Sequence, residues 1–455
     1  MNNFKDQLKT VNGLQFVYEN LHLRTQIGKS LLLNQFPYTD AELLQQELDK
    51  VENGSHFWEM NHIIARQIPP LLQELNDIQQ TIQNLKKLQV LDDIELFEIK
   101  KFAILSQKIK NLLEDADYQD IALDNLSKVV ETLDPEKSQI PHFYIYSVYH
   151  QDLEPLRKKI QQTTDPSEKE KLIWQASQIE DSVRQKLTEL LHPYWANLLK
   201  NLHALAYFDL LLGKAQLALT EHWCKPEILM NTIQYKQLFN PEVKSILQQT
   251  NQEFQSIDIE LRSKPCLITG ANMSGKTVLL KTIALSQTLF QFGFYVPAHE
   301  ATLCPVEEII CLIEDQQSEK KGLSSFAIEI LNIDKIIQYA KKGTKLLALV
   351  DELARTTNPD EGKCLVNAFI TMMDKYDVMS VVTTHYSGIT APCHRLRVNG
   401  LIVDEISDKI TPQNINRFMD YSLVETTSDD VPAEALKIAE IFNIDDEFLQ
   451  LAKKK

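Results

Sequence analysis

The chain has 455 residues, of which 44% are hydrophobic, and this length predicts about two to four domains with a sizeable buried core. Its formal net charge of -16 argues against a broad basic surface for nucleic acid, although a local basic groove remains open. The chain shows no signal peptide or membrane span, and its six cysteines are scattered without metal spacing. These features predict a cytoplasmic protein with reduced thiols.

The first half of the chain is predicted to be helical. Residues 55–212 contain no glycine, which is typical of long helices. Apolar residues recur at helical spacing in two stretches, Leu71, Leu75, Ile78, Ile82 and Leu85, then Leu172, Ala176, Ile179, Val183, Leu187 and Leu190. Between them, Asp165-Pro166-Ser167 predicts a short turn and the N-cap of the next helix.

After about residue 262 the pattern changes. Short apolar runs at 266–269, 346–350 and 378–382 alternate with helical segments. This alternation predicts a parallel sheet with helices on both faces. The fold class is therefore α/β plus all-α, with a helical domain first and the sheet domain second.

The stretch "TGANMSGKT" at 269–277 fills the fixed positions of a phosphate-binding loop with Gly270, Gly275, Lys276 and Thr277. It follows an apolar run and opens a helix, so its backbone N–H groups and the helix dipole are expected to surround phosphates. We expect Lys276 to contact the β- and γ-phosphates and the Thr277 hydroxyl to bind Mg²⁺. The expected nucleotide-binding residues are Gly270, Ala271, Asn272, Met273, Ser274, Gly275, Lys276 and Thr277.

Two further segments carry polar residues at strand ends. "LLALVDE" ends in Asp351 and Glu352, which predicts a Mg²⁺ ligand and a residue that polarises the attacking water. Alternatively, this pair caps a helix. His385 in "VVTTHY" is expected at the same sheet edge, near the γ-phosphate, although an isolated histidine can also be an ordinary polar residue.

The second half of the chain resembles the ATPase domain of the MutS mismatch-repair family, a branch of the ABC-type ATPases. The resemblance lies in the stretches quoted above and in "YVPAHEATLCPVEEI", "GLSSFAIEI" and "LVDELARTTNPDEG". Residues 21–52, 150–160 and 205–219 resemble the start of that family's helical core, the entry to its lever helices and its last core helix. The resemblance implies a helical core and lever domain at 1–235 and an ABC-type P-loop ATPase domain at 236–455.

The resemblance also implies a composite site in a homodimer that binds ATP and Mg²⁺. Two ATPase domains would pair head to tail, and Gly322, Ser324 and Ser325 of "GLSSF" would reach the partner's γ-phosphate. Ser324 could instead cap the helix that follows. Phe254 resembles the residue that stacks on adenine, but it could equally belong to the core.

The chain also departs from the family pattern. Ser274 replaces a glycine, Leu323 stands where arginine is usual, and "ELARTTNP" lacks two glycines. These departures bear on the geometry of the signature segment "GLSSF" and on communication between the two paired nucleotide sites. The mismatch-reading and connector domains are expected to be absent, and the clamp reduced to the turn at Asp165. Residues 151–192 carry seven Lys/Arg against eight Asp/Glu, so these lever tips show no basic surface.

Two functions stay open at this point. The first is an ATP-switched protein that binds DNA weakly and by shape. The second is a motor for a protein client, because some short MutS-like ATPases resemble this chain and reactivate adenosylcobalamin-dependent aminomutases. A metabolic kinase is disfavoured, since the signature-like segment implies a dimeric motor without an acceptor pocket.

Overall fold

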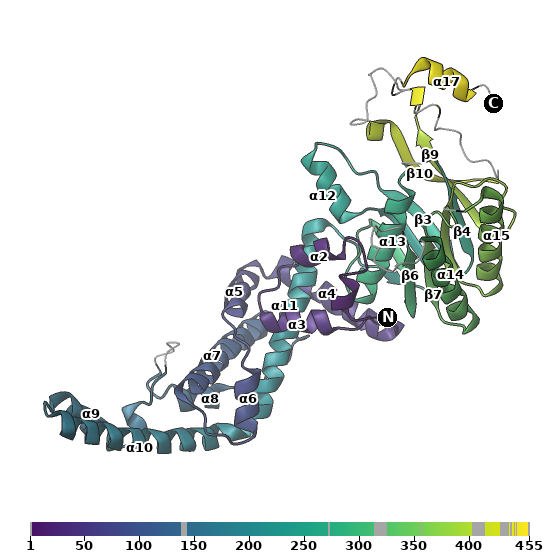
Figure 1. Ribbon diagram of the computed structural model, residues 1–455. Helices are drawn as coiled ribbons and strands as arrows, with labels where there is room; N and C mark the ends of the chain where they lie inside the picture. The colour runs from purple at the N-terminus through teal and green to yellow at the C-terminus, as the bar shows by residue number, and fades with distance from the viewer. Residues whose placement is uncertain are drawn as a thin grey trace. The chain divides into compact units, whose positions relative to one another are not determined.

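The computed structural model describes residues 2–137, 143–271, 274–313, 325–355, 357–402, 415–427, 436, 439–440, 442 and 444–453. The chain forms two compact units (Figure 1). The first, which we call the sheet unit, comprises residues 1–21, 34–49 and 217–455, and the second, the helical unit, comprises 22–33 and 50–216. Two early segments therefore lie with the sheets, whereas the sequence grouped them with the helical domain. The single boundary at residue 235 stays a prediction.

The helical unit contains helices only, within the residues that the structure describes. Helices α3, α4 and α11 continue into the sheet unit at one end. The elements are α3 (Gln26–Asn34), α4 (Ala41–Met60), α5 (His62–Gln73), α6 (Gln79–Lys86), α7 (Asp93–Asp115), α8 (Ser127–Leu133), η1 (Ser147–Tyr149), α9 (Leu153–Gln162), α10 (Pro166–Leu191), η2 (His192–Tyr194) and α11 (Trp195–Glu221).

The first apolar stripe is buried but does not form one helix. Leu75, Ile78, Ile82 and Leu85 are buried as expected, yet α5 ends at Gln73 and α6 begins at Gln79. The Asp77 carboxylate accepts a hydrogen bond from the Gln79 N–H at 2.9 Å, which closes a local turn around Ile78, the N-cap of α6. The second stripe lies on α10, where four of its residues are buried, namely Leu172, Ala176, Val183 and Leu187.

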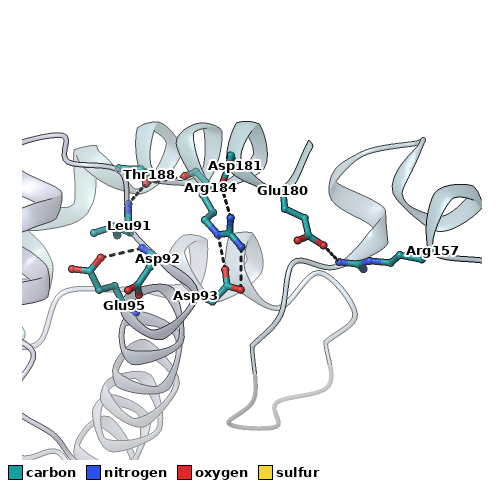
Figure 2. A network of polar contacts seen from close by, with 9 residues as sticks. All are labelled: Leu91, Asp92, Asp93, Glu95, Arg157, Glu180, Asp181, Arg184 and Thr188. Atoms are coloured by element: carbon teal, nitrogen blue, oxygen red, sulfur yellow. Dashed lines mark hydrogen bonds and ion pairs between the residues drawn. The ribbon is translucent and has the colours of Figure 1, made fainter. Parts of the chain in front are cut away.

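Helices α9 and α10 form an antiparallel hairpin, as the turn at 165–167 predicts (Figure 1). Asp165 is the N-cap of α10, and its side chain accepts a hydrogen bond from the Ser167 N–H. Figure 2 shows the ion pairs that fasten the hairpin at its base. Arg157 on α9 contacts Glu180 on α10 at 2.7 Å, and Arg184 reaches from α10 to Asp93, the first residue of α7, at 2.8 Å.

A buried ion pair lies deeper in the helical unit. Lys100 on α7 donates to the Asp134 carboxylate at 3.0 Å and to the Tyr146 hydroxyl oxygen at 2.9 Å. The Lys100 and Asp134 side chains are 0% and 1% exposed, so each ion depends on the other for compensation of its lost hydration. These contacts hold α7 against Asp134 and Tyr146, both of which follow α8 in the chain.

The described strands of the sheet unit form two sheets. Six strands align in the order β10-β9-β4-β8-β7-β6, with all neighbours parallel except β10 and β9, and four align as β1-β5-β2-β3. The strands are β1 (Glu227–Ile228), β2 (Thr232–Leu238), β3 (Ile257–Arg262), β4 (Pro265–Thr269), β5 (Glu300–Leu303), β6 (Glu308–Leu312), β7 (Leu346–Val350), β8 (Met379–Thr384), β9 (His394–Leu401) and β10 (Met419–Glu425). The three predicted apolar runs fall on β4, β7 and β8, which confirms a mixed α/β fold.

Helices cover both faces of the six-stranded sheet. The helices of this unit are α1 (Phe4–Gln7), α2 (Leu14–Asn20), α12 (Pro241–Gln249), α13 (Lys276–Gln291), α14 (Ser325–Lys341), α15 (Pro359–Lys375), η4 (Ile415–Phe418) and α17 (Asp446–Lys453). One buried cluster joins α14 and α15 to alternate residues of β7, among them Ala348 and Val350. Helix α13 lies on the other side of the sheet (Figure 1). Within the described residues, no helix is long and apolar enough to cross a membrane.

The early segments belong to the sheet unit because their aromatic residues pack beyond the end of α13. The Phe4 ring lies 5.0 Å from the Phe292 ring and 6.2 Å from the Phe294 ring. The Tyr38 N–H donates to the Gln291 carbonyl at 2.7 Å, and the Gln291 amide donates back to the Tyr38 carbonyl at 3.0 Å. These contacts are long-range, so sequence periodicity carries no sign of them.

Candidate functional site at the carboxyl edge of the large sheet

The parallel register brings several strand ends together. Thr269 at the end of β4 pairs with Thr384 at the end of β8, and Val350 at the end of β7 pairs with Val382. The residues that follow these strands therefore lie at one edge of the sheet, where ligands bind in open α/β folds. The predicted loop at 270–275 and the pair Asp351 and Glu352 both start at this edge.

Both invariant glycines of the loop pattern are required by the local structure. A Cβ atom on Gly270 would lie 2.9 Å from the Ser274 Oγ and 3.2 Å from the Val398 Cβ. Gly275 adopts a φ of 80°, and a Cβ there would also lie 3.0 Å from the Tyr421 ring. A side chain at either position would distort the loop.

Lys276 is the first residue of α13 and is 4% exposed. Its ammonium group donates to the carbonyls of Gly270 at 2.9 Å and Ala271 at 2.8 Å. The side chain thus folds back along the loop, which places a positive charge against the turn. The buried Ser274 hydroxyl has no hydrogen-bond partner within the described atoms.

A hydrogen-bonded chain connects the start of α13 with the ends of β7 and β8. The Thr277 hydroxyl donates to one Asp351 carboxylate oxygen at 2.6 Å, and the Thr383 hydroxyl donates to the other at 2.6 Å. The Glu352 N–H donates to the Thr383 hydroxyl oxygen at 2.8 Å. A hydroxyl and a carboxylate in contact form the hard oxygen donor set that Mg²⁺ takes in phosphate sites. Thr277 and Asp351 therefore fit the predicted metal ligands.

Glu352 and His385 flank this chain. Glu352 has a φ of 46°, and its carboxylate contacts the Arg355 guanidinium at 3.2 Å. His385 directly follows β8 and is exposed, with its ring 4.3 Å from that of Tyr386. Both residues lie at the expected edge, and their chemical roles stay predictions.

A cavity of about 680 Å³ adjoins the loop. Phe254 lines it, as does Tyr421 from β10, together with Gly275 and Val278 of the loop and α13. Two aromatic side chains beside a phosphate-type loop are suited to holding a planar base. Phe254 is half-buried in this wall rather than buried in the core.

Gln255 joins the two aromatic walls of the cavity. Its amide group donates to the Asp420 carboxylate at 2.7 Å, and its carbonyl accepts from the Tyr421 N–H at 2.9 Å. Although burial opposes it, hydrogen bonds from Ser422, Gln255 and Asn399 hold the pKa of Asp420 well below its usual range. The ionised carboxylate therefore remains available to Gln255.

Some predicted residues lie outside the described ranges, namely Asn272, Met273, Gly322 and Ser324. Ser325 starts α14, and its backbone alone is described. Sequence reasoning missed Thr383, which precedes His385 by two residues, and also Gln255 and Tyr421. Thr383 could have been inferred from the strand end in "VVTTHY". Tyr421 comes from a strand 144 residues after the loop's Thr277 with no motif of its own.

Residues 266–455 match the family model for MutS domain V. Among curated proteins, Endonuclease MutS2 of Levilactobacillus brevis is 32% identical over 214 residues, 47% of this chain and 26% of that protein. Endonuclease MutS2 of Pediococcus pentosaceus is 34% identical over 211 residues, 46% of this chain and 26% of that protein. DNA mismatch repair protein MutS of Listeria monocytogenes is 29% identical over 234 residues, 50% of this chain and 27% of that protein. The matched region therefore spans about a quarter of each relative's length.

Proposed function

Because this chain belongs to the MutS family, with domain V at residues 266–455, we propose that it is a dimeric switch protein that binds and hydrolyses ATP. The observation that carries the proposal is the hydrogen-bonded chain from Thr277 through Asp351 to Thr383, next to a buried Lys276. Lys276 and Thr277 begin α13, Asp351 follows β7, and Thr383 lies on β8. The site thus combines a loop lysine and two possible metal ligands, the groups that triphosphate hydrolysis requires.

The phosphate part of the site would use the loop and the start of α13. Backbone N–H groups of 270–275 and the dipole of α13 would hold the phosphates, and Lys276 would leave its loop carbonyls for phosphate oxygens. Thr277 and Asp351 would hold Mg²⁺, which supplies charge neutralisation on the phosphate oxygens. The base would lie in the cavity between Phe254 and Tyr421.

Hydrolysis would then depend on Glu352 and His385. Water forms a bond to the γ-phosphorus while the bond to the β–γ bridging oxygen breaks, which gives ADP and inorganic phosphate. Glu352 would accept a hydrogen bond from that water and orient it, and His385 would contact the γ-phosphate. For Glu352 to reach water it must leave Arg355, whose side chain is 59% exposed.

We propose that Gly322, Ser324 and Ser325 complete the nucleotide site of a second copy. A mixing experiment tests this. A Lys276→Ala chain and a Ser324→Ala/Ser325→Ala chain should each be inactive alone and regain part of the ATPase rate together, because one interface of the heterodimer keeps both intact halves. Heterodimers are verified by affinity tags. A dilute monomer that hydrolyses ATP at the full rate would exclude a shared site.

The switch would act on DNA structure, since the relatives are named for mismatch repair or as endonucleases. We expect this DNA affinity to be no tighter than about micromolar at physiological salt, without mismatch preference, since the net charge is -16. ATP turnover should be measured alone, with homoduplex, mismatched and branched DNA, and with an inactivated aminomutase plus cobalamin. Stimulation by the aminomutase alone would replace the DNA proposal with the protein-client alternative, which the relatives' names do not support.

A further inference from the structure

The turn that carries Glu352 adopts an uncommon backbone conformation. Glu352 has a φ of 46° and Ala354 a φ of 62°, both in the left-handed region that glycine enters most easily. The chain has no glycine between Gly343 and Gly362, so residues with side chains must occupy this conformation. Neighbouring groups must therefore hold the turn in place.

Two side chains hold the turn at Ala354. The Ala354 N–H donates to the Glu329 carboxylate at 2.7 Å, and the Ala354 carbonyl accepts from the Tyr386 hydroxyl at 2.7 Å. The Ala354 methyl group is fully buried among residues of α14 and α15. Ala354 lies two positions after Glu352, and both its N–H and its carbonyl are thus held by side-chain hydrogen bonds.

The two anchors come from functionally distinct segments. Glu329 lies on α14, one helical turn after Ser325, and Tyr386 follows His385. Burial, with the nearby carboxylates of Glu329 and Glu352, raises the pKa of the Tyr386 phenol, so its hydroxyl stays a donor. Gly362 on α15 leaves room for this ring, because a Cβ there would lie 2.5 Å from the Tyr386 oxygen.

We propose that Glu329 is a positioning residue that sets the orientation of Glu352 through Ala354 and couples α14 to hydrolysis. This inference rests on the proposed ATPase function. If the start of α14 contacts a partner's nucleotide, a shift of α14 moves Glu329 and thereby the turn that aims Glu352. Nucleotide binding uses the loop and the base cavity, which Glu329 does not line. Glu329 therefore affects the hydrolysis step and leaves affinity unchanged.

The test compares Glu329→Ala with Glu329→Gln in the full-length protein. The amide oxygen of glutamine can still accept from the Ala354 N–H, so Glu329→Gln should keep kcat within about threefold of the wild type. Glu329→Ala should lower kcat by about tenfold or more, because small misplacements of reacting groups are costly, and leave the ATP dissociation constant unchanged. Asp334→Ala is the matched control on α14, since Asp334 is exposed and contacts only Gln338 within the described hydrogen bonds.

A second variant separates positioning from folding. Glycine accepts a φ of 62° without support, so Ala354→Gly should recover part of the kcat lost in Glu329→Ala. An unchanged kcat in Glu329→Ala would overturn the proposal, as would equal damage by alanine and glutamine. A parallel fall in kcat, ATP affinity and melting temperature would show that Glu329 only stabilises the fold. If the wild-type protein has no ATPase activity, the proposed function fails instead.

Discussion

The carboxyl edge of the large sheet and the base of the α9–α10 hairpin are both rich in polar contacts, but they use them differently. At the sheet edge, hydroxyl groups from α13 and β8 converge on one carboxylate, that of Asp351. At the hairpin base, the charged groups form ion pairs with one another. Arg184, for example, pairs with Asp93 and with Asp181 (Figure 2). Convergence on a shared oxygen donor set indicates a ligand site, whereas mutual pairing indicates attachment of helices.

Substitution of Lys276 at the sheet edge should have the largest effect of the changes that test this comparison. Lys276→Ala should remove ATP binding, since the main charge on the phosphates is lost, and lower turnover by about 10²-fold or more. Glu352→Gln should bind ATP normally and stall at hydrolysis. Filter binding of labelled ATP and single-turnover kinetics separate the two effects. Equal ATP affinity in the wild type and Lys276→Ala would contradict the assignment of this edge.

Lys100 offers the largest effect in the helical unit. Lys100→Met should lower the free energy of unfolding by about 3 to 5 kcal/mol, because the Asp134 carboxylate is left buried without its ion. Urea unfolding measures the loss. Lys108→Met on the exposed side of α7 should change it by less than about 0.5 kcal/mol. If both variants lost a similar free energy of unfolding, the buried ion pair of Lys100 and Asp134 would have no specific role in stability.

Gln255 should have an intermediate effect that is confined to the base cavity. Gln255→Ala removes two hydrogen bonds between the cavity walls, which should weaken ADP binding by about tenfold. Inorganic tripolyphosphate contacts only the loop, so its affinity should not change. Isothermal titration with both ligands measures the difference. A loss of affinity for both ligands would show that Gln255 supports the loop rather than the base.

Arg184 should have the smallest effect. Arg184→Ala removes a partly exposed ion pair network, which should lower the free energy of unfolding by about 1 kcal/mol and leave ATP turnover unchanged. The hydrogen bonds that the Arg184 guanidinium donates to the Asp93 carboxylate raise the pKa of Arg184, so the effect should not vary between pH 6 and pH 9. Lys186→Ala is the exposed control. A changed ATPase rate in Arg184→Ala would instead connect the hairpin base to the site.

The sequence predicted the parts of the site that depend on local pattern. The loop, the pair Asp351 and Glu352 and the position of His385 follow from strand ends and spacing, and the structure brings them to one edge. Gln255 and Tyr421 were missed because a contact between residues 166 apart has no local signal. The break between α5 and α6 was missed because the apolar periodicity continues through the turn at Asp77, where a side chain bonds to the backbone just before α6. Glu329 belongs to no motif, and its contact with Ala354, 25 positions away, comes from the packing of α14 beside the turn.

The mutual hydrogen bonds of Tyr38 and Gln291 also bear on how the chain reaches its native state. These residues are 253 positions apart, so this contact closes a very long loop. At a synthesis rate of roughly 5 to 20 residues per second, Tyr38 leaves the ribosome about 10 to 50 s before its partner. The residues between them include the larger segment of the helical unit, residues 50–216, so this unit can form first from its own contacts. During this interval Phe4 lacks its contacts with Phe292 and Phe294, and apolar surface left uncovered in this way favours aggregation.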